Sequence, residues 1–241
     1  MEEKQSLALV SGANRGIGLA IVAGLAREGV RVLMGCRDLA RGEAACSPLR
    51  EEGLSVCPVP LDITSETSVS NVAQLIAGEY GSLDILVNNA GIALDYDPSL
   101  PVVERMQRTL AVNVVGTVRL TEAMVPLLAG SAHPRIVNVS SELASFGLRG
   151  TPTWEYATTV MPTYQASKAA VNSLTLSYAG LLADRGIKVN AMCPGFTATE
   201  ATNFTGSRSP EQAAVIALRL ALLEDDGPTG TFANDQGRLP W

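Results

Sequence analysis

"SLALVSGANRGIGLAIVAGLAREG", residues 6–29, joins a short apolar run to a longer helical pattern through a loop that contains three glycines. The first seven residues are mostly apolar, which is typical of a strand buried on both faces of a parallel sheet. From Gly16 onward, apolar residues recur at helical spacing until Gly29 closes the pattern. The order strand, glycine loop, helix predicts the start of a βαβ unit.

The same alternation continues along the chain. Further strands are expected in residues 30–36, 55–63, 83–91, 134–141 and 187–195, with a last short one in 227–241. Helices are expected in residues 38–53, 68–80, 101–128, 161–180 and 211–223. Strands that alternate with helices predict an α/β fold, a Rossmann-type doubly wound parallel sheet with helices on both faces. No repeat or linker divides the sequence, so residues 1–241 are predicted to form a single domain.

Composition excludes several classes of function. The chain has 241 residues, 46% hydrophobic and 17% charged, with a net charge of −6 and no basic stripe, which argues against nucleic acid as a partner. No apolar run reaches the length of a membrane span, and the acidic start without a basic region predicts no signal peptide. Four cysteines without metal spacing are expected to be reduced, in a cytoplasmic protein with no metal site. A single histidine makes Ser-His hydrolysis a poor candidate.

The glycine loop has the chemistry of a phosphate-binding turn. Gly12 allows a tight turn, Gly16 lets the backbone approach a pyrophosphate, and Gly18 lets helix and strand pack closely. The helix that follows presents free N–H groups and the positive end of its dipole. The alternative is a glycine-rich turn without a ligand.

A second candidate site is Tyr164 with Lys168. Their spacing of four residues places them on one face of a helix, about 6 Å apart. An ammonium beside a phenol favours ionisation of the phenol, so the pKa of Tyr164 is expected to fall. The pair alone is also compatible with a structural role in a buried helix.

Five motifs in this order resemble the short-chain dehydrogenase/reductase family. They are "SGANRGIG" (11–18), "NNAG" (88–91), "VNVSS" (137–141), "YQASK" (164–168) and "PGFTAT" (194–199). The resemblance covers nearly the whole chain and is strongest to the NADPH-dependent carbonyl reductases, with which it also shares "CRDLARGEAA" and the ending "GPTGTFANDQGRLPW". It implies a nicotinamide cofactor and a small carbonyl or alcohol substrate.

Carried over to this sequence, the family pattern names a cofactor site. The glycine loop contributes Gly12, Asn14, Arg15, Gly16, Ile17 and Gly18, and the ends of three later strands contribute Asp62, Ile63, Asn89, Ala90, Gly91, Pro194, Gly195, Thr197 and Thr199. A basic residue after the second strand attracts the 2′-phosphate of NADP, whereas an acidic one binds the ribose of NAD. Cys36 stands where NAD-type members show the acid, and Arg37 follows it, so NADPH is favoured over NAD. Asp38 is the counter-evidence, because a register slip of one residue would place it at the ribose.

The resemblance also names catalytic residues. Tyr164 is the expected acid that gives a proton to the substrate oxygen, with Lys168 beside it, and both also contact the nicotinamide ribose. Ser141 is expected to bind that oxygen, with Ser140 as the near alternative. Asn113 matches a helix asparagine that supports a proton path to the lysine; it is equally compatible with bonding its own backbone.

The segment between Ser141 and Tyr164 leaves part of the function open. Twenty-three residues separate Ser141 from Tyr164, more than is common in the family, and the extra segment contains Trp154 and Tyr156, which either wall the substrate pocket or pack on the surface. The insertion also leaves oligomeric state open between a homodimer, a homotetramer and a monomer. The leading hypothesis is an NADPH-dependent carbonyl reductase. The alternatives are an NAD-preferring dehydrogenase of a secondary alcohol, sugar alcohol or steroid, and a non-catalytic nucleotide sensor.

Overall fold

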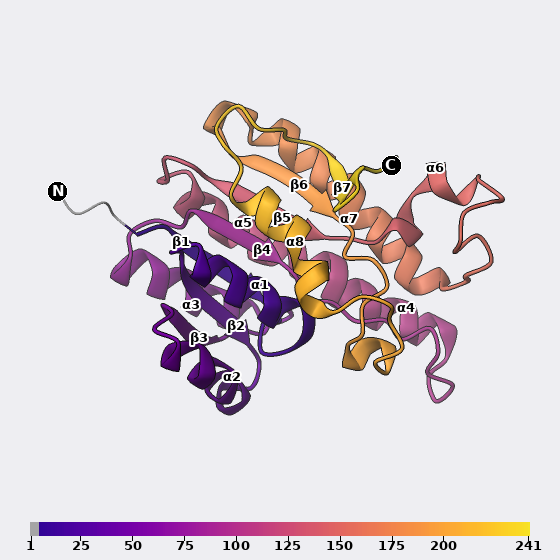
Figure 1. Cartoon of the computed structure of the whole chain (residues 1–241), viewed down its shortest axis with the longest axis horizontal. Helices are drawn as coiled ribbons and strands as arrows, with labels where there is room; N and C mark the ends of the chain where they lie inside the picture. Colours follow the sequence, from indigo (N-terminus) through magenta and orange to yellow (C-terminus); the bar gives the residue numbers. More distant parts are fainter. Residues whose placement is uncertain (1–4) are drawn as a thin grey trace.

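An eight-stranded sheet runs through the middle of the molecule with helices on both faces (Figure 1). The structure is a computed structural model, and it describes residues 5–241. The strands are β1 (Leu7–Ser11), β2 (Arg31–Cys36), β3 (Val56–Pro60), β4 (Ile85–Asn88), β5 (Arg135–Val139), β6 (Lys188–Met192), β7 (Phe232–Asn234) and β8 (Gly237–Arg238). Their order is β3-β2-β1-β4-β5-β6-β7-β8, and among these described strands only the pair of β7 and β8 is antiparallel. The α/β fold class predicted from the sequence is confirmed.

The helices are α1 (Gly16–Arg27), α2 (Leu39–Glu51), α3 (Glu66–Glu79), α4 (Val102–Leu110), α5 (Thr117–Leu128), α6 (Phe146–Arg149), α7 (Pro162–Leu181) and α8 (Pro210–Ala221). A π-helical segment, Ala111–Gly116, joins α4 to α5, and 3-10 turns cover Glu142–Ala144, Ala183–Arg185 and Glu200–Thr202. Two large apolar clusters fill the space between the sheet and the helices on each face. One packs α1, α2 and α8 against the sheet, and the other packs α3, α5 and α7 against the opposite face.

Strand order reverses direction beside β1, which pairs with β2 on one side and with β4 on the other. The chain segments that leave β1 and β4 therefore turn to opposite faces of the sheet. In doubly wound folds this divergence opens a crevice at the carboxyl ends of the strands, where ligands bind. All the motifs that follow β1, β4, β5 and β6 are brought to that edge.

The helix predicted over residues 101–128 is one continuous stretch, Val102–Leu128, but its middle is π-helical. By length and mean hydropathy alone this stretch could cross a membrane, although its sequence contains no unbroken apolar run of that length. The apolar residues of this stretch raise its mean hydropathy, but charged residues interrupt them. Leu120, Met124 and Leu128 are fully buried against the sheet, and a core helix of this kind passes the same test.

Candidate active site

The glycine loop after β1 has the geometry of a phosphate cradle. Gly12 and Gly16 have positive φ angles of 62° and 54°, which disfavour a side chain. A Cβ on Gly12 would lie 2.9 Å from the Cα of Ala90, and one on Gly18 would lie 2.6 Å from the Gly12 carbonyl oxygen. Arg15 precedes α1 without a side-chain cap, so the first N–H groups of that helix point into the loop unpaired by a cap. The residues present fit a pyrophosphate at this position.

Asn89 and Ser11 tie this loop to the end of β4. The Asn89 side-chain amide donates to the carbonyls of Ser11 at 2.9 Å and Gly12 at 3.0 Å. The Ser11 hydroxyl oxygen accepts from the backbone N–H groups of Asn89 and Ala90, both at 3.1 Å. A Cβ on Gly18 would lie only 2.5 Å from the Asn89 amide nitrogen, so this contact requires glycine there. Two predicted cofactor motifs thus form one rigid edge.

Lys168, Asn113 and Gly91 also lie together. Lys168 is buried, and its Nζ donates to the Val139 carbonyl at the end of β5 at 2.7 Å. A Cβ on Gly91 would lie 3.4 Å from both the Asn113 Oδ1 and the Lys168 Nζ. Residues predicted from three separate motifs therefore meet at the carboxyl edge of the sheet.

Asn113 sits inside the π-helical segment, which the sequence did not reveal. Its Oδ1 accepts from the backbone N–H of Ile92, and its Nδ2 donates to the Ile92 carbonyl, both at 2.8 Å. The same Nδ2 donates to the Ser167 hydroxyl at 3.0 Å. The side chain thus bonds the β4 loop and α7 rather than its own helix backbone. A π segment at such a residue is frequent at functional sites.

The two serines at the end of β5 are distinguished by their contacts. Ser140 is fully buried, and its hydroxyl donates to the Asn172 side chain at 2.5 Å and to the Lys168 carbonyl at 3.3 Å. The Ser141 hydroxyl accepts from the Leu143 N–H at 3.2 Å, and the Ser141 side chain lies near enough to the Tyr164 phenol to lower its pKa. Ser140 therefore supports α7 from inside, whereas Ser141 faces the phenol.

Protonation of the Tyr164 and Lys168 pair differs from the sequence expectation. Burial raises the pKa of Tyr164 to about 12, and the nearby Ser141 side chain only partly offsets this. Burial lowers the pKa of Lys168 to about 8. The Lys168 Nζ lies 5.7 Å from the centre of the phenol ring and is bonded to Val139. The expected fall in the pKa of Tyr164 is therefore wrong for the protein without cofactor, because loss of water on burial is the largest influence on the phenol.

Asp95, in the loop after β4, fixes the start of α7 and was not found from the sequence. Its carboxylate accepts from the Thr163 N–H at 2.9 Å, the Thr163 hydroxyl at 2.7 Å and the Tyr164 N–H at 3.0 Å. These are N–H groups of the first turn of α7, which Met161 leaves uncapped. Asp95 lies 69 residues before Tyr164, so the only sequence signal was an unassigned acid beyond "NNAG".

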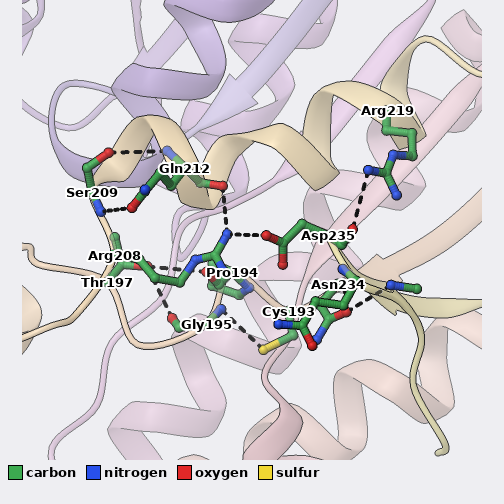
Figure 2. A network of polar contacts seen from close by, with 12 residues as sticks. Cys193, Pro194, Gly195, Thr197, Arg208, Ser209, Gln212, Arg219, Asn234 and Asp235 are labelled. Atoms are coloured by element: carbon green, nitrogen blue, oxygen red, sulfur yellow. Dashed lines mark hydrogen bonds and ion pairs between the residues drawn. The ribbon is translucent and has the colours of Figure 1, made fainter.

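Arg208 holds the loop after β6 through hydrogen bonds to that loop, to α8 and to the residue after β7 (Figure 2). The Arg208 guanidinium donates to the Asp235 carboxylate at 2.7 Å and to the Gln212 carbonyl at 3.0 Å. Its backbone pairs with Phe196 and Ala198 on either side of Thr197. This fixes the path of Pro194 and Gly195, the latter with a φ of 73°. Arg208 was not predicted, because its carboxylate partner Asp235 lies 27 positions later in the sequence.

Within that loop the two predicted threonines differ. Thr197 is buried, and its hydroxyl donates to the carbonyls of Gly195 at 3.1 Å and Pro194 at 3.4 Å. Thr199 faces the glycine loop, since a Cβ on Gly16 would lie 3.2 Å from its methyl carbon. An ion pair between Arg15 and Glu200 joins the same two loops. Thr197 therefore shapes the loop, and Thr199 borders the crevice.

At the far end of the crevice, Cys36 is buried and Arg37 is exposed. Asp38 caps α2, accepting from the Arg41 N–H at 3.1 Å, and it also forms an ion pair with the Arg41 side chain. Asp62 is partly buried, which raises its pKa, but hydrogen bonds from Thr64 and the charges of Arg37 and Arg119 leave the net pKa below its usual value. Arg37 thus lies near the end of β3.

The remaining cofactor residues lie beside these elements. Ile63 is buried and accepts from Arg119 through its carbonyl at 2.8 Å. Asn14 and Ile17 are partly buried in and after the glycine loop. The carboxyl edge of the sheet thus has a basic side chain after β2 and the Ser141 and Tyr164 hydroxyls beyond β5.

Comparison with known proteins agrees with this geometry. A family model described as short chain dehydrogenase matches residues 6–209. The chain is 34% identical to "Carbonyl reductase [NADPH] 1" of Sus scrofa, covering 100% of this chain and 96% of that protein. It is 32% identical to "(+)-neomenthol dehydrogenase" of Arabidopsis thaliana, covering 96% of each.

Among solved structures, the NADPH-bound carbonyl reductase from chicken fatty liver superposes with a TM-score of 0.86 and 25% identity, covering 99% of this chain and 100% of that one. The eight-stranded, mostly parallel sheet flanked by helices matches these structures. The chain belongs to the short-chain dehydrogenase/reductase family.

Proposed function

We propose that this protein is an NADPH-dependent carbonyl reductase, which reduces a ketone or aldehyde to the alcohol and runs in reverse as an alcohol dehydrogenase. The observation that carries this proposal is the Ser141 side chain close enough to the Tyr164 phenol to lower its pKa, beside the buried Lys168. These side chains lie at the same sheet edge as the glycine loop. A proton donor and a dinucleotide cradle on one edge are what carbonyl reduction requires.

The chain's own residues would bind and orient the cofactor. The glycine loop and the free N–H groups of α1 would hold the pyrophosphate, and Asn89, Ala90 and Gly91 would lie along the ribose. Asp62 and Ile63 would border the adenine, and Pro194, Gly195, Thr197 and Thr199 the nicotinamide. When bound, the nicotinamide supplies hydride chemistry.

Proton delivery falls to Tyr164. With a pKa of about 12, its phenol is protonated at neutral pH and can give its proton to the substrate oxygen. Ser141 would hold that oxygen by a hydrogen bond. Lys168, with a pKa of about 8, exchanges protons readily near neutral pH and would return one to the phenol. Asn113 fixes the backbone of Ile92 beside this path.

The preference for NADPH rests on Arg37 and Asp38. Arg37 is exposed directly after β2 and has no acid in ion-pair contact among residues 5–241, so its guanidinium is available to a 2′-phosphate. Asp38 is already used as the cap of α2 and in the ion pair with Arg41. An NAD-preferring alcohol dehydrogenase would need Asp38 at the ribose, which would remove that cap. A cytoplasmic location is proposed with the four free cysteines as support.

Side-by-side fluorescence titration with NADPH and NADH, followed by a screen of ketones and aldehydes, tests this function. The proposal requires NADPH to bind at least tenfold more tightly, about 1.4 kcal/mol, and carbonyl-dependent oxidation of NADPH. Equal or tighter binding of NADH would favour the NAD-preferring dehydrogenase. Tight NADPH binding without any turnover would favour the nucleotide sensor.

A further inference from the structure

The long segment between Ser141 and Tyr164 places one carboxylate beside the proposed catalytic pair. Glu142 directly follows Ser141 and starts the 3-10 turn Glu142–Ala144. The segment then forms α6 and a loop that returns to the start of α7 (Figure 1). The role of this carboxylate in substrate selection, inferred below, rests on the proposed carbonyl reduction.

Glu142 is held by Trp154 of the added segment and by Cys193, which follows β6. Its Oε2 accepts from the indole N–H of Trp154 at 3.3 Å, and its Oε1 accepts from the Cys193 thiol at 3.5 Å. The ring of Trp154 meets that of Tyr156 edge to face, with centroids 5.6 Å apart. Glu142, Trp154 and Tyr156 are each partly exposed, so they form a surface and not a sealed core. We call these three side chains the Glu142 wall.

The Glu142 wall adjoins the reacting groups through Cys193. The Cys193 thiol is buried directly before Pro194 and is near enough to both Tyr164 and Lys168 to act on their pKa values. Glu142 contacts that same sulfur and also donates its backbone N–H to it at 3.2 Å. The Glu142 carboxylate and the Tyr164 phenol therefore both lie near the Cys193 thiol.

The Glu142 carboxylate has no cationic partner in the described part of the chain. Among residues 5–241, the ion pairs include neither Glu142 nor the neighbouring Glu155. The one arginine of the segment, Arg149, donates to the Thr159 carbonyl instead. The pKa of the Cys193 thiol is raised to about 12, first by burial and second by the charge of Glu142. Glu142 and Glu155 also raise the pKa of Tyr156, again after burial.

We propose that the Glu142 wall selects carbonyl substrates that carry a positively charged nitrogen, an ammonium or protonated amine, on the side away from the nicotinamide. A carboxylate without a cationic partner attracts such a group, and indole and phenol rings add cation–π attraction. A neutral substrate of equal size would leave the carboxylate unpaired. Glu142 is thus a specificity-determining residue of the proposed reaction.

The first test compares two ketones of equal shape, 4′-(trimethylammoniomethyl)acetophenone and 4′-neopentylacetophenone, with NADPH as reductant. The wild-type protein is expected to show the higher kcat/KM for the cationic ketone. Glu142→Gln should lower that value tenfold or more while changing the neutral ketone by less than threefold. The ratio between variants cancels the different intrinsic reactivity of the ketones. Glu79→Gln, an exposed site at the end of α3, removes the same charge and should leave the ratio unchanged.

If Glu142 had a purely structural role, Glu142→Gln would lower kcat/KM for both ketones by the same factor, and that outcome would overturn the proposal. An unchanged ratio in Glu142→Gln would overturn it too. Calorimetric titration with benzyltrimethylammonium, which cannot be reduced, separates this inference from the proposed function. Binding that Glu142→Gln weakens at least tenfold supports the cation site even if neither ketone turns over, in which case only the proposed reduction fails. Equal binding to both proteins contradicts the site.

Discussion

The backbone N–H of Tyr164 donates a 3.0 Å hydrogen bond to the carboxylate of Asp95, a residue 69 positions earlier in the loop after β4. The same carboxylate receives two further bonds from Thr163. A negative charge at the first turn of α7 is also favoured by the helix dipole. Asp95 thereby links the chain segment that borders the cofactor crevice to the residue proposed to deliver the proton.

Asp95→Asn should therefore impair catalysis more than it impairs folding. The amide replaces one accepting oxygen with a donor that faces N–H groups, so we expect a loss of about 1–2 kcal/mol in the free energy of unfolding. We also expect a fall in kcat of roughly tenfold, since 1.4 kcal/mol of misplacement corresponds to that factor. Asp97→Asn is the matched control, because the Asp97 carboxylate bonds Ser99 within the same loop. Equal effects of both variants on kcat would refute a positioning role.

Substitution by alanine should change the free energy of unfolding in opposite directions at two glycines. A Cβ at Gly18 would lie 2.5 Å from the Asn89 amide and 2.6 Å from the Gly12 carbonyl, so Gly18→Ala should destabilise by about 1–3 kcal/mol and weaken cofactor binding. Gly78, within α3, meets nothing within 4 Å, so Gly78→Ala should stabilise by about 0.5–1 kcal/mol. Urea unfolding measures both. A stabilising Gly18→Ala would show that the loop and Asn89 do not pack as described.

Lys168 should make stability rise with pH in the cofactor-free protein. Its folded pKa is about 8, below the ordinary lysine value of 10.5, because burial disfavours the ammonium. Between these pH values the unfolded chain retains a proton that the folded chain has released, so the free energy of unfolding increases with pH. The gain over this window is on the order of 3 kcal/mol, at about 1.36 kcal/mol per pH unit.

Urea unfolding of wild type and Lys168→Met across pH 7–11 measures this gain as a difference, which removes the titration of Tyr164 and Cys193 common to both proteins. Lys188→Met, on β6, controls for loss of a lysine. If the free energy of unfolding of wild type falls relative to that of Lys168→Met as the pH rises, burial is not the dominant influence on Lys168.

Arg37→Ala should reduce affinity for NADPH about tenfold and leave NADH unchanged, since the lost contact is to the 2′-phosphate alone. Arg27→Ala provides the control, because Arg27 is an exposed arginine paired with Glu52 at the end of α1. Parallel fluorescence titrations with both nucleotides decide the matter. Equal losses for NADPH and NADH in Arg37→Ala would remove it as the source of selectivity.

Local sequence patterns predicted the parts of this site that depend on local geometry. Residues 6–29 form a strand, a glycine turn and a helix that follow one another directly. The spacing of the glycines with positive φ is therefore enough to predict the phosphate-binding loop. Tyr164 and Lys168 share a helix face for the same reason. The fold follows from the alternation of elements, and only the final hairpin of β7 and β8 added a strand to those expected among the described residues.

The residues that sequence reasoning missed depend on contacts between distant segments. Asp95 and Arg208 act through partners brought near by the tertiary fold, and neither stands in a motif. The π-helical segment at Asn113 is tied to Ile92 and Ser167 by bonds that no helical periodicity encodes. The pKa of Tyr164 was misjudged because burial, which spacing does not report, is the largest influence on the phenol.

The most direct test of the central claim is carbonyl-dependent oxidation of NADPH by wild type and Tyr164→Phe, with NADPH affinity measured on the same samples. Phenylalanine keeps the ring but removes the hydroxyl that lies near Ser141. General acid catalysis is worth about 10²–10⁴-fold, so turnover should fall by at least about 100-fold while NADPH affinity changes less than threefold. Near-normal turnover by Tyr164→Phe would contradict the assignment of Tyr164 as the proton donor.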